Sequence, residues 1–282
     1  MSTATTTILI TGATDGLGRE LALRLAAPGT LLLLHGRDAG RAGEVQRLVR
    51  AAGGAAHVLL ADLSELREVD RLADEVRSAY DRLDVLVNNA GIGFGAPGAP
   101  RQQNRDGVEL HFAVNYLAGY HLSNRLLTLL TERPGPTPPP AGERGRIVNV
   151  ASAGQQPIDF TDPQLTTGYD GITAYRQSKL AQITATFDLA DRLGPDGVTV
   201  NALHPASFMA TTMVRTSGVE PWSTVAEGAE ATLRLVTGAN GPVTGRYYNG
   251  TDETTAHEQA YDPKAREQLR ALSDALVSRA LG

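Results

Sequence analysis

Short apolar runs recur along the chain and alternate with longer segments in which apolar residues return every three or four positions. The runs lie at residues 8–10, 31–34, 58–60, 85–87, 147–150 and 198–200. Strands that are buried on both faces of a parallel sheet have this nearly continuous apolar character. The pattern therefore predicts a strand at each run.

Helices are predicted between these strands. Apolar residues between positions 66 and 80 fall at helical spacing, as do those between 180 and 187. Alternating strands and helices form α/β folds, in which right-handed crossovers place helices on both faces of the sheet. We predict an α/β fold with a doubly wound (Rossmann) parallel sheet, built as one domain over residues 1–282.

Two segments stand outside this alternation. Residues 132–145 are rich in Pro and Gly, and because the alternation resumes at once, we interpret them as a surface loop rather than a domain linker. Residues 263–281 carry apolar residues on one face and are predicted to form a closing helix that packs against the body of the protein.

Composition excludes several functional classes. Hydrophobic residues make up 41% of the chain, the net charge is −5, and no basic tract is present, which argues against nucleic-acid binding. The chain has no cysteine and its histidines lack ligand spacing, so we expect no disulfide and no catalytic metal. No run of about 18 apolar residues occurs, so we expect no membrane span and a cytoplasmic protein.

A glycine-rich turn follows the first predicted strand. Residues 11–18 read Thr-Gly-Ala-Thr-Asp-Gly-Leu-Gly and open a predicted helix. Glycines allow close approach of the backbone to a pyrophosphate, whose charge the helix amino end favours. A glycine-rich turn alone is weak evidence, and its place after the first strand strengthens the interpretation.

The end of the second strand bears on cofactor choice. An acidic residue at position 36 would bind the ribose hydroxyls of NAD, but the chain has Gly36 followed by Arg37. Arg37 can bind a 2′-phosphate, or it can be a solvated arginine beside Asp38, which would cap the next helix. We predict NADP(H) in preference to NAD(H). Asp15 argues the other way, because its carboxylate is expected near the same ribose.

Candidate acid–base chemistry lies in the segment Tyr175-Arg176-Gln177-Ser178-Lys179. Residues four apart share one face of a helix, so the phenol and the ammonium can act at one point. A nearby cation stabilises a phenolate. The pair could also be an ordinary surface neighbourhood. However, Lys179 and Lys264 are the only lysines among 26 basic residues, which indicates a need for a compact charge at position 179.

Three further elements occur in a matching order. Asn88 to Gly91 end the fourth predicted strand, and Ser152 follows the fifth. Asn115 lies in an apolar helical setting, where an amide needs hydrogen-bond partners. Each alone could be a cap or a satisfied core group.

Together these motifs resemble the short-chain dehydrogenase/reductase superfamily from about residue 8 to about residue 250. Within it, the segment from Asp159 to Ala181 and the run Asn201-Ala-Leu-His-Pro205 are similar to the retinol-dehydrogenase and WW-domain-oxidoreductase branch. Many of those relatives have an N-terminal membrane anchor or an extra domain, and we expect neither here.

The resemblance implies the roles of the catalytic residues. Tyr175 would give a proton to the substrate oxygen while hydride leaves the nicotinamide, and Ser152 would hydrogen-bond that oxygen. Lys179 would lower the pKa of Tyr175 and hold the nicotinamide ribose, and Asn115 would hold a water that relays protons toward Lys179. We expect these roles to combine positioned acid catalysis with an oriented hydride donor.

The resemblance also implies a cofactor site formed at the strand ends. Asp62 would lie against the adenine, and the turn at 89–91 against the adenosine ribose. The implied cofactor-binding residues are Gly12, Thr14, Asp15, Gly16, Leu17, Gly18, Arg37, Asp62, Leu63, Asn89, Ala90, Gly91, Tyr175, Lys179, Pro205, Ser207, Phe208 and Thr211.

The chain departs from the family pattern after the sixth strand. Pro205 is followed by Ala206 where the family has Gly, and Ala210 stands where a Thr is usual, so the register of nicotinamide contacts in 207–212 stays open. The interval between Ser152 and Tyr175 is long, so we expect residues 155–171 to form a flap that shapes substrate choice.

The resulting hypothesis is an NADPH-dependent reductase of a ketone or aldehyde on a fairly apolar small molecule. The alternatives are an NAD(P)⁺-dependent alcohol dehydrogenase and a dinucleotide-binding protein without turnover. Members of the family often dimerise through their fourth and fifth helices, so a homodimer is an option here, although the long loops could block it.

Overall fold

Eight strands form one sheet in the order β3-β2-β1-β4-β5-β6-β7-β8 in the computed structural model, which describes residues 6–132, 144–194 and 197–282. All neighbours are parallel except β7 and β8, which pair antiparallel. The strands are β1 Thr6–Ile10, β2 Thr30–Gly36, β3 Ala55–Leu60, β4 Val85–Asn88, β5 Arg146–Val150, β6 Thr199–His204, β7 Arg246–Asn249 and β8 Asp252–Thr254.

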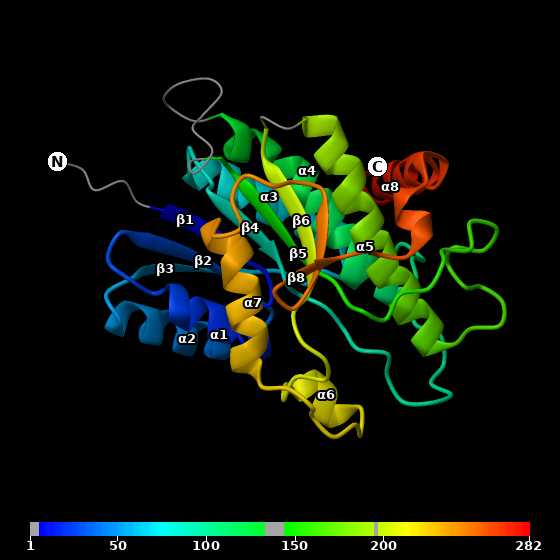
Figure 1. The fold of residues 1–282 in the computed structure, drawn as a ribbon, viewed down its shortest axis with the longest axis horizontal. Coiled ribbons are helices and arrows are strands. Elements are labelled where there is room, and N and C mark those ends of the chain that lie inside the picture. The colour runs from blue at the N-terminus through cyan, green and yellow to red at the C-terminus, as the bar shows by residue number, and fades with distance from the viewer. Residues whose placement is uncertain (1–5, 133–143, 195–196) are drawn as a thin grey trace.

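Helices cover both faces of this sheet (Figure 1). One face is covered by α1, α2 and α7, and the other by α3, α4 and α5. The helices are α1 Gly16–Leu25, α2 Ala39–Ala51, α3 Leu66–Ala79, the π-helix η1 Phe112–Leu117, α4 Ala118–Thr131, α5 Gly171–Leu193, α6 Thr212–Thr216, α7 Val225–Thr237, the 3-10 helix η3 Glu258–Tyr261 and α8 Pro263–Leu281. The predicted doubly wound α/β fold is confirmed.

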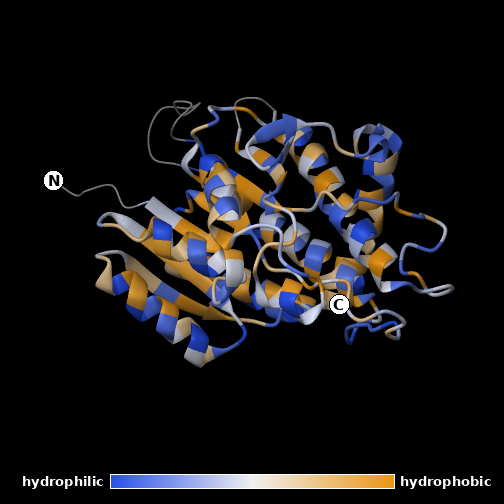
Figure 2. Cartoon of the chain, turned by 60° about the horizontal axis from the view of Figure 1, so that its bottom comes forward, coloured by the Kyte–Doolittle hydropathy of each residue, from blue (hydrophilic) through white to orange (hydrophobic). Residues whose placement is uncertain are grey.

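The apolar residues of each strand pack into two cores, one on each side of the sheet, because successive side chains point to opposite faces of the sheet. In β1, Ile8 and Ile10 pack in the core beneath α1 and α7, whereas Leu9 packs in the core beneath α3 and α4. Figure 2 shows hydrophobic residues concentrated on the strands and on the helix sides that face them. Burial on both faces explains why these strands read as unbroken apolar runs.

The strand order reverses between β1 and β4, and this positions the candidate site. The chain runs from β1 outward to β3 and then returns to place β4 beside β1. At such a switch point the loops after neighbouring strands diverge and leave a crevice at the carboxyl edge of the sheet. Every motif singled out in the sequence follows a strand of this sheet or lies near the start of the helix after that strand.

The structure adds elements that the apolar pattern did not predict. β7 and β8 are short, and only Tyr247 and Tyr248 of β7 are buried. The predicted closing helix is α8, which spans Pro263–Leu281 as expected. The predicted surface loop at 132–145 lies mostly outside the described residues. No described helix has the length and apolarity needed to cross a bilayer.

Candidate active site

The turn between β1 and α1 contains the glycines predicted to approach a pyrophosphate. Gly12 and Gly16 have φ angles of +65° and +48°, in the region that favours glycine. A Cβ on Gly18 would lie 2.2 Å from the carbonyl oxygen of Gly12. The turn therefore needs these glycines, and the amino end of α1 is a place where a phosphate can bind.

A buried histidine at the end of β2 supports this turn. The Gly12 N–H donates to His35 Nδ1 at 3.2 Å, and His35 Nε2 lies 3.1 Å from the Ala61 carbonyl oxygen. Burial lowers the pKa of His35 to about 4, so the ring is neutral with its proton on Nε2. Sequence analysis missed His35; the available signal was a polar side chain inside an apolar strand.

The turn after β4 is joined to the glycine-rich turn. The Asn89 side-chain amide donates to the carbonyl oxygens of Thr11 and Gly12 at 2.8 and 3.2 Å. The backbone N–H groups of Asn89 and Ala90 both donate to Thr11 Oγ1. The two turns therefore form one rigid edge of the crevice.

Asp15 is paired with an arginine that the sequence did not bring to attention. It caps α1 by accepting from the Gly16 N–H at 2.8 Å, and its Oδ2 lies 3.0 Å from Arg41 Nη2. Partial burial raises the pKa of Asp15. The hydrogen bonds with Thr212, Gly16 and Arg41, together with the Arg41 charge, lower this pKa by more, so the net shift is downward. The charge of Asp15 is thus balanced by a neighbour. Arg37 is exposed and has no ion-pair partner among the described residues.

Gly36 offers no acidic side chain to a ribose, and it also allows close packing at the end of β2. A Cβ at this position would lie 2.5 Å from Thr14 Cγ2, so the strand end and the glycine-rich turn touch here. Leu17 is buried in the core, which leaves only its backbone to face a ligand. Asp62 is exposed after β3 and accepts from the Ser64 N–H at 3.0 Å, while Leu63 is buried.

The first turns of α5 place the predicted tyrosine and lysine on one face. Asp170 caps the helix by accepting from the Thr173 N–H at 2.8 Å. Lys179 Nζ lies 5.9 Å from the centre of the Tyr175 ring. The Ser152 side chain lies close enough to the phenol to lower its pKa. The structure therefore brings Ser152, Tyr175 and Lys179 together, as the sequence predicted.

Burial dominates the electrostatics of this group. It raises the pKa of Tyr175 above 10, and the hydrogen bond with Ser152 offsets only part of that rise. Burial also lowers the pKa of Lys179 to about 8. Its Nζ donates to the Val150 carbonyl oxygen at 2.9 Å and lies 3.4 Å from Gln182 Oε1. The expected lowering of the Tyr175 pKa by Lys179 is not seen in this geometry and stays a prediction for the dinucleotide-bound enzyme.

Ser152 is fixed from its backbone as well as from its side chain. Its Oγ accepts from the Gly154 N–H at 3.0 Å, and its carbonyl oxygen accepts from the Tyr247 hydroxyl at 3.0 Å. Tyr247 lies on β7, a strand that the apolar pattern did not predict. Sequence analysis consequently missed this support.

Asn115 lies in η1 and its side chain has the partners that its burial requires. Its Oδ1 accepts from the Ile92 N–H at 2.7 Å, and its Nδ2 lies 3.2 Å from the Ile92 oxygen and 3.0 Å from Ser178 Oγ. π-Helical turns are rare and are frequent at functional sites. Here the π-helical turn carries an amide that links the turn after β4 to α5.

The segment after β6 lies against the glycine-rich turn. Thr211 caps α6, and a Cβ on Gly16 would lie 2.9 Å from Thr211 Cγ2. Ser207 Oγ lies 3.0 Å from His204 Nε2. Phe208 has a φ of +44°, and its ring meets that of Trp222 with the centroids 4.7 Å apart. Pro205 is buried, whereas Ser207 is exposed and residues 208–211 are partly buried, so they lie outside the core.

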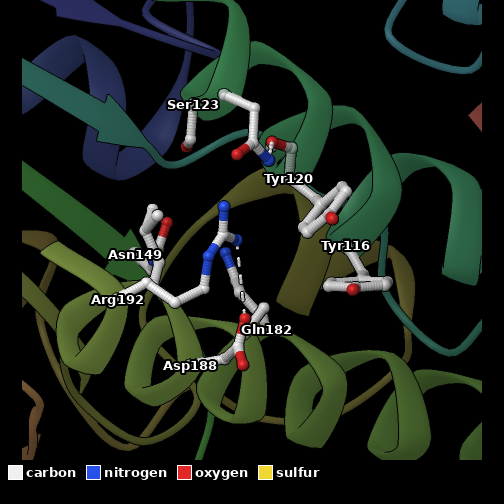
Figure 3. Close-up of a pocket in the computed structure, with 11 residues that line it drawn as sticks. Tyr116, Tyr120, Ser123, Asn149, Gln182, Asp188 and Arg192 are labelled. Atoms are coloured by element: carbon white, nitrogen blue, oxygen red, sulfur yellow. Dashed lines mark hydrogen bonds and ion pairs between the residues drawn. The ribbon is translucent and has the colours of Figure 1, made fainter. Parts of the chain in front are cut away.

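Two hollows lie beside η1, α4 and α5. One, of about 230 Å³, is lined by Thr11, Leu63, Ala90 and Asn115 among others. The other, of about 390 Å³, lies between α4 and α5, where Tyr120 and Ser123 face Asp188 and Arg192 (Figure 3). Gly119 and Gln182 line both hollows, so the two hollows are neighbours.

No group of three His, Asp or Glu side chains suited to a metal ion occurs in residues 6–132, 144–194 and 197–282. The loop after β4 reaches Tyr175. Phe94 meets the Tyr175 ring edge-on, with the centroids 6.0 Å apart and an interplanar angle of 82°. Sequence analysis did not single out this residue.

Comparison with known proteins points to one family. The family profile of the short chain dehydrogenases matches residues 6–221. The chain is 32% identical over 298 residues to retinol dehydrogenase 14 of Mus musculus, an alignment that covers 96% of this chain and 85% of that protein.

Solved structures show the same likeness. A crystal structure of an uncharacterised protein from Mycobacterium Paratuberculosis superimposes with a TM-score of 0.75 and 27% identity, covering 98% of this chain and 95% of that one. The landomycin C-6 ketoreductase LanV, with bound NADP and rabelomycin, superimposes with a TM-score of 0.65 and 28% identity, covering 87% and 94%.

Proposed function

The chain belongs to the short-chain dehydrogenase family, in its retinol-dehydrogenase-like branch, and is an NAD(P)-dependent oxidoreductase of CH–OH and C=O groups; on this premise we propose that it uses NADPH to reduce a ketone or aldehyde of a fairly apolar small molecule. The observation that carries the proposal is the juxtaposition of the Ser152 side chain and the Tyr175 phenol, with Lys179 one helical turn away.

The crevice residues fit a nicotinamide dinucleotide. A Cβ at Gly18 would strike backbone, and Gly12 and Gly16 have positive φ, so the turn gives a pyrophosphate close access to the amino end of α1. When bound, the dinucleotide supplies the hydride. The residues that would hold it are those named from the sequence: the turn 11–18, Arg37, Asp62, Leu63, the turn 89–91, Tyr175, Lys179, Pro205, Ser207, Phe208 and Thr211.

The protein's own part is to polarise the carbonyl and deliver a proton. Ser152 Oγ hydrogen-bonds the substrate oxygen and holds it against Tyr175. The Tyr175 hydroxyl donates its proton to that oxygen as negative charge develops there. The Lys179 ammonium stabilises the phenolate that results. Asn115 holds the Ile92 turn, and a water-borne relay from Asn115 toward Lys179 remains part of the proposal.

NADPH is preferred in this proposal because cationic groups gather beyond β2. Arg37 is exposed and free to bind a 2′-phosphate bidentately. The Asp15 carboxylate, which would repel that phosphate, is paired with Arg41. Ketoreductase LanV was solved with NADP, which agrees with this choice.

The substrate is proposed to be apolar because the Phe94 ring packs edge-on against the Tyr175 ring. In the segment after β6, Phe208 packs on Trp222, whose exposed fraction is 73%. An exposed aromatic pair is a candidate contact for an apolar ligand.

Oxidation of NADPH by a panel of ketones and aldehydes tests the function. Replacing a general acid lowers rates by about 10² to 10⁴, so Tyr175→Phe should lose activity on that scale while still binding NADPH. Tyr80→Phe is the matched control, because Tyr80 ends α3 at the opposite edge of the sheet and bonds His57. Tight NADPH binding with no turnover on any substrate would instead favour a dinucleotide-binding protein.

Three broader statements also remain proposals. Residues 1–282 act as one dinucleotide-binding and catalytic domain, in keeping with the one continuous sheet. The protein is cytoplasmic, which cell fractionation would test. A homodimer through α4 and α5 must share that face with α8, because Arg270 and Arg266 of α8 pair with Asp188 and Asp191 of α5.

A further inference from the structure

Glu109 and His111 form a buried pair beside the candidate active site that the proposed chemistry does not use. Their exposed fractions are 2% and 6%. His111 Nδ1 lies 2.8 Å from Glu109 Oε1, and His111 Nε2 lies 2.9 Å from the Gly93 carbonyl oxygen. A carbonyl oxygen and a carboxylate only accept hydrogen bonds, so both ring nitrogens must carry protons.

Hydrogen-bond donors surround the Glu109 carboxylate. Its Oε2 accepts from the Phe112 N–H at 2.8 Å, and the Tyr169 hydroxyl lies 3.4 Å from Oε1. Both oxygens therefore face donors, which makes His111 the donor in its hydrogen bond with Glu109.

On this geometry we propose that His111, as an imidazolium held by Glu109, is a positioning residue that sets the wall of the substrate crevice. The inference rests on the proposed function, because it assigns a role in holding the carbonyl substrate. His111 acts through Gly93 and touches neither the phenol nor the dinucleotide turn.

The pair joins segments that are far apart in the chain. His111 holds the loop after β4 through Gly93. The Glu109 N–H donates to Gln164 Oε1 at 2.8 Å, and Tyr169 approaches the Glu109 carboxylate. Gln164 and Tyr169 belong to the flap at 155–171. The Glu109–His111 pair and the Glu109 backbone therefore connect the loop after β4 with the flap at 155–171.

The loop held by His111 leads directly to the catalytic tyrosine. Ile92 is bonded to Asn115, Gly93 to His111, and the Phe94 ring meets the Tyr175 ring edge-on. Three consecutive residues are thus anchored to two neighbouring helices. Release of Gly93 would free Phe94 to leave the Tyr175 ring and widen the place where the substrate binds.

The hydrogen bonds from the His111 ring to Glu109 and Gly93 depend on pH in one direction. Burial lowers the pKa of His111, but the hydrogen bond and charge of Glu109 and the Gly93 carbonyl raise it more, so the net shift is upward from 6.5. This pair of hydrogen bonds is therefore complete below pH 6.5. It is lost as pH rises through the pKa of His111 in the folded protein. The other titratable group facing the ring from the described residues is Tyr169, whose pKa is raised to about 12 by burial and Glu109 and which stays neutral over this range.

NMR titration of the His111 ring tests the charge state without any turnover. The wild-type ring should titrate above pH 6.5 with both nitrogens protonated at neutral pH. In Glu109→Gln its pKa should fall below that of the wild type, because the carboxylate charge is gone while burial remains. A wild-type ring that titrates below 6.5 would overturn the proposal, whatever the protein catalyses.

Steady-state kinetics test the positioning role. In His111→Gln the KM for the carbonyl substrate should rise about tenfold, the loss expected for one charged hydrogen bond. The kcat and the dissociation constant of NADPH should change less than twofold. His57→Gln, which alters a histidine bonded to Tyr80 across the molecule, should match the wild type.

The pH profile separates positioning from mere structure. The wild-type KM should rise with pH as His111 loses its proton, and this rise should be absent in His111→Gln. Equal KM values in the two proteins, or the same pH-dependent rise in both, would contradict the role. If the wild type reduces no carbonyl, the proposed function fails, and the NMR result still decides the charge of His111.

Discussion

At the scale of single residues, the candidate site depends on a buried ammonium. Lys179 is buried and its pKa is lowered to about 8, while its Nζ is held by the Val150 carbonyl oxygen. A charge in a low-dielectric site acts strongly on a neighbouring phenol, but it can also be lost near physiological pH. The same burial that makes Lys179 effective therefore sets an upper pH limit for the enzyme.

The reductase rate should accordingly fall as pH rises through about 8, because neutral Lys179 no longer stabilises the phenolate. Lys179→Met should be slower by about 10² or more at pH 7 and should lack this descending limb. Stability should move the other way in the wild type: between about 8 and 10.5 the unfolded chain binds more protons, so its stability rises with pH. A wild-type rate that is flat from pH 7 to 10 would contradict the assignment.

Arg37 carries the cofactor preference at this scale. Arg37→Ala should raise the KM for NADPH by about 10-fold or more and leave the KM for NADH nearly unchanged, because a charged hydrogen bond to phosphate is lost only with NADPH. Arg47→Ala, an exposed arginine on α2, is the control and should affect neither. Equal effects of Arg37→Ala on both cofactors would remove the assignment.

Some of these residues were predictable and others were not, for physical reasons. Tyr175 and Lys179 are one helical turn apart, so their spacing alone places them together. The pair of Asp15 and Arg41 joins the starts of two helices, and only the folded sheet brings those ends together. The direction of the Tyr175 pKa likewise depends on burial, which spacing does not reveal.

At the scale of elements, close contacts between turns decide what the crevice can bind. Gly18 has no room for a side chain because the Gly12 carbonyl lies against it, and Gly36 faces Thr14 in the same way. The strands were predictable because burial on both faces leaves unbroken apolar runs. The π-helix at η1 was not, because a single extra residue per turn leaves no mark on an apolar pattern.

Gly18→Ala should therefore damage both the turn and the cofactor site. We expect a loss of at least about 2 kcal/mol in the free energy of unfolding, since the new methyl group meets backbone that cannot yield, together with weaker NADPH binding. Gly43→Ala in α2 is the matched control, because its Cβ would meet nothing within 4 Å. That change should stabilise by about 0.5–1 kcal/mol. Urea unfolding of the two variants measures the contrast.

At the scale of the whole molecule, α8 completes the face of the sheet that carries the site. Leu269, Leu276 and Ala280 of α8 pack with Phe112 and Leu117 of η1 in one core. The Tyr116 hydroxyl lies 2.7 Å from Ser273 Oγ within the same contact. The position of α8 was not predictable, because its apolar face could pack against any partner of matching shape.

Leu269→Ala should lower the free energy of unfolding by about 2–5 kcal/mol, the usual loss when a fully buried leucine is truncated. Leu281→Ala, which alters an exposed leucine at the end of the same helix, should change it by less than about 0.5 kcal/mol. Similar losses in both variants would show that α8 does not pack as described.

Deuterium transfer tests the proposed reaction most directly. NADPH that carries deuterium on the nicotinamide C4 is mixed with the best carbonyl substrate of the panel. Mass spectrometry then measures the deuterium content of the alcohol product. With the wild type the product should gain one deuterium, and with Tyr175→Phe its formation should slow by about 10² to 10⁴. Deuterium in the product at an unchanged rate in Tyr175→Phe would contradict the role of Tyr175 as proton donor.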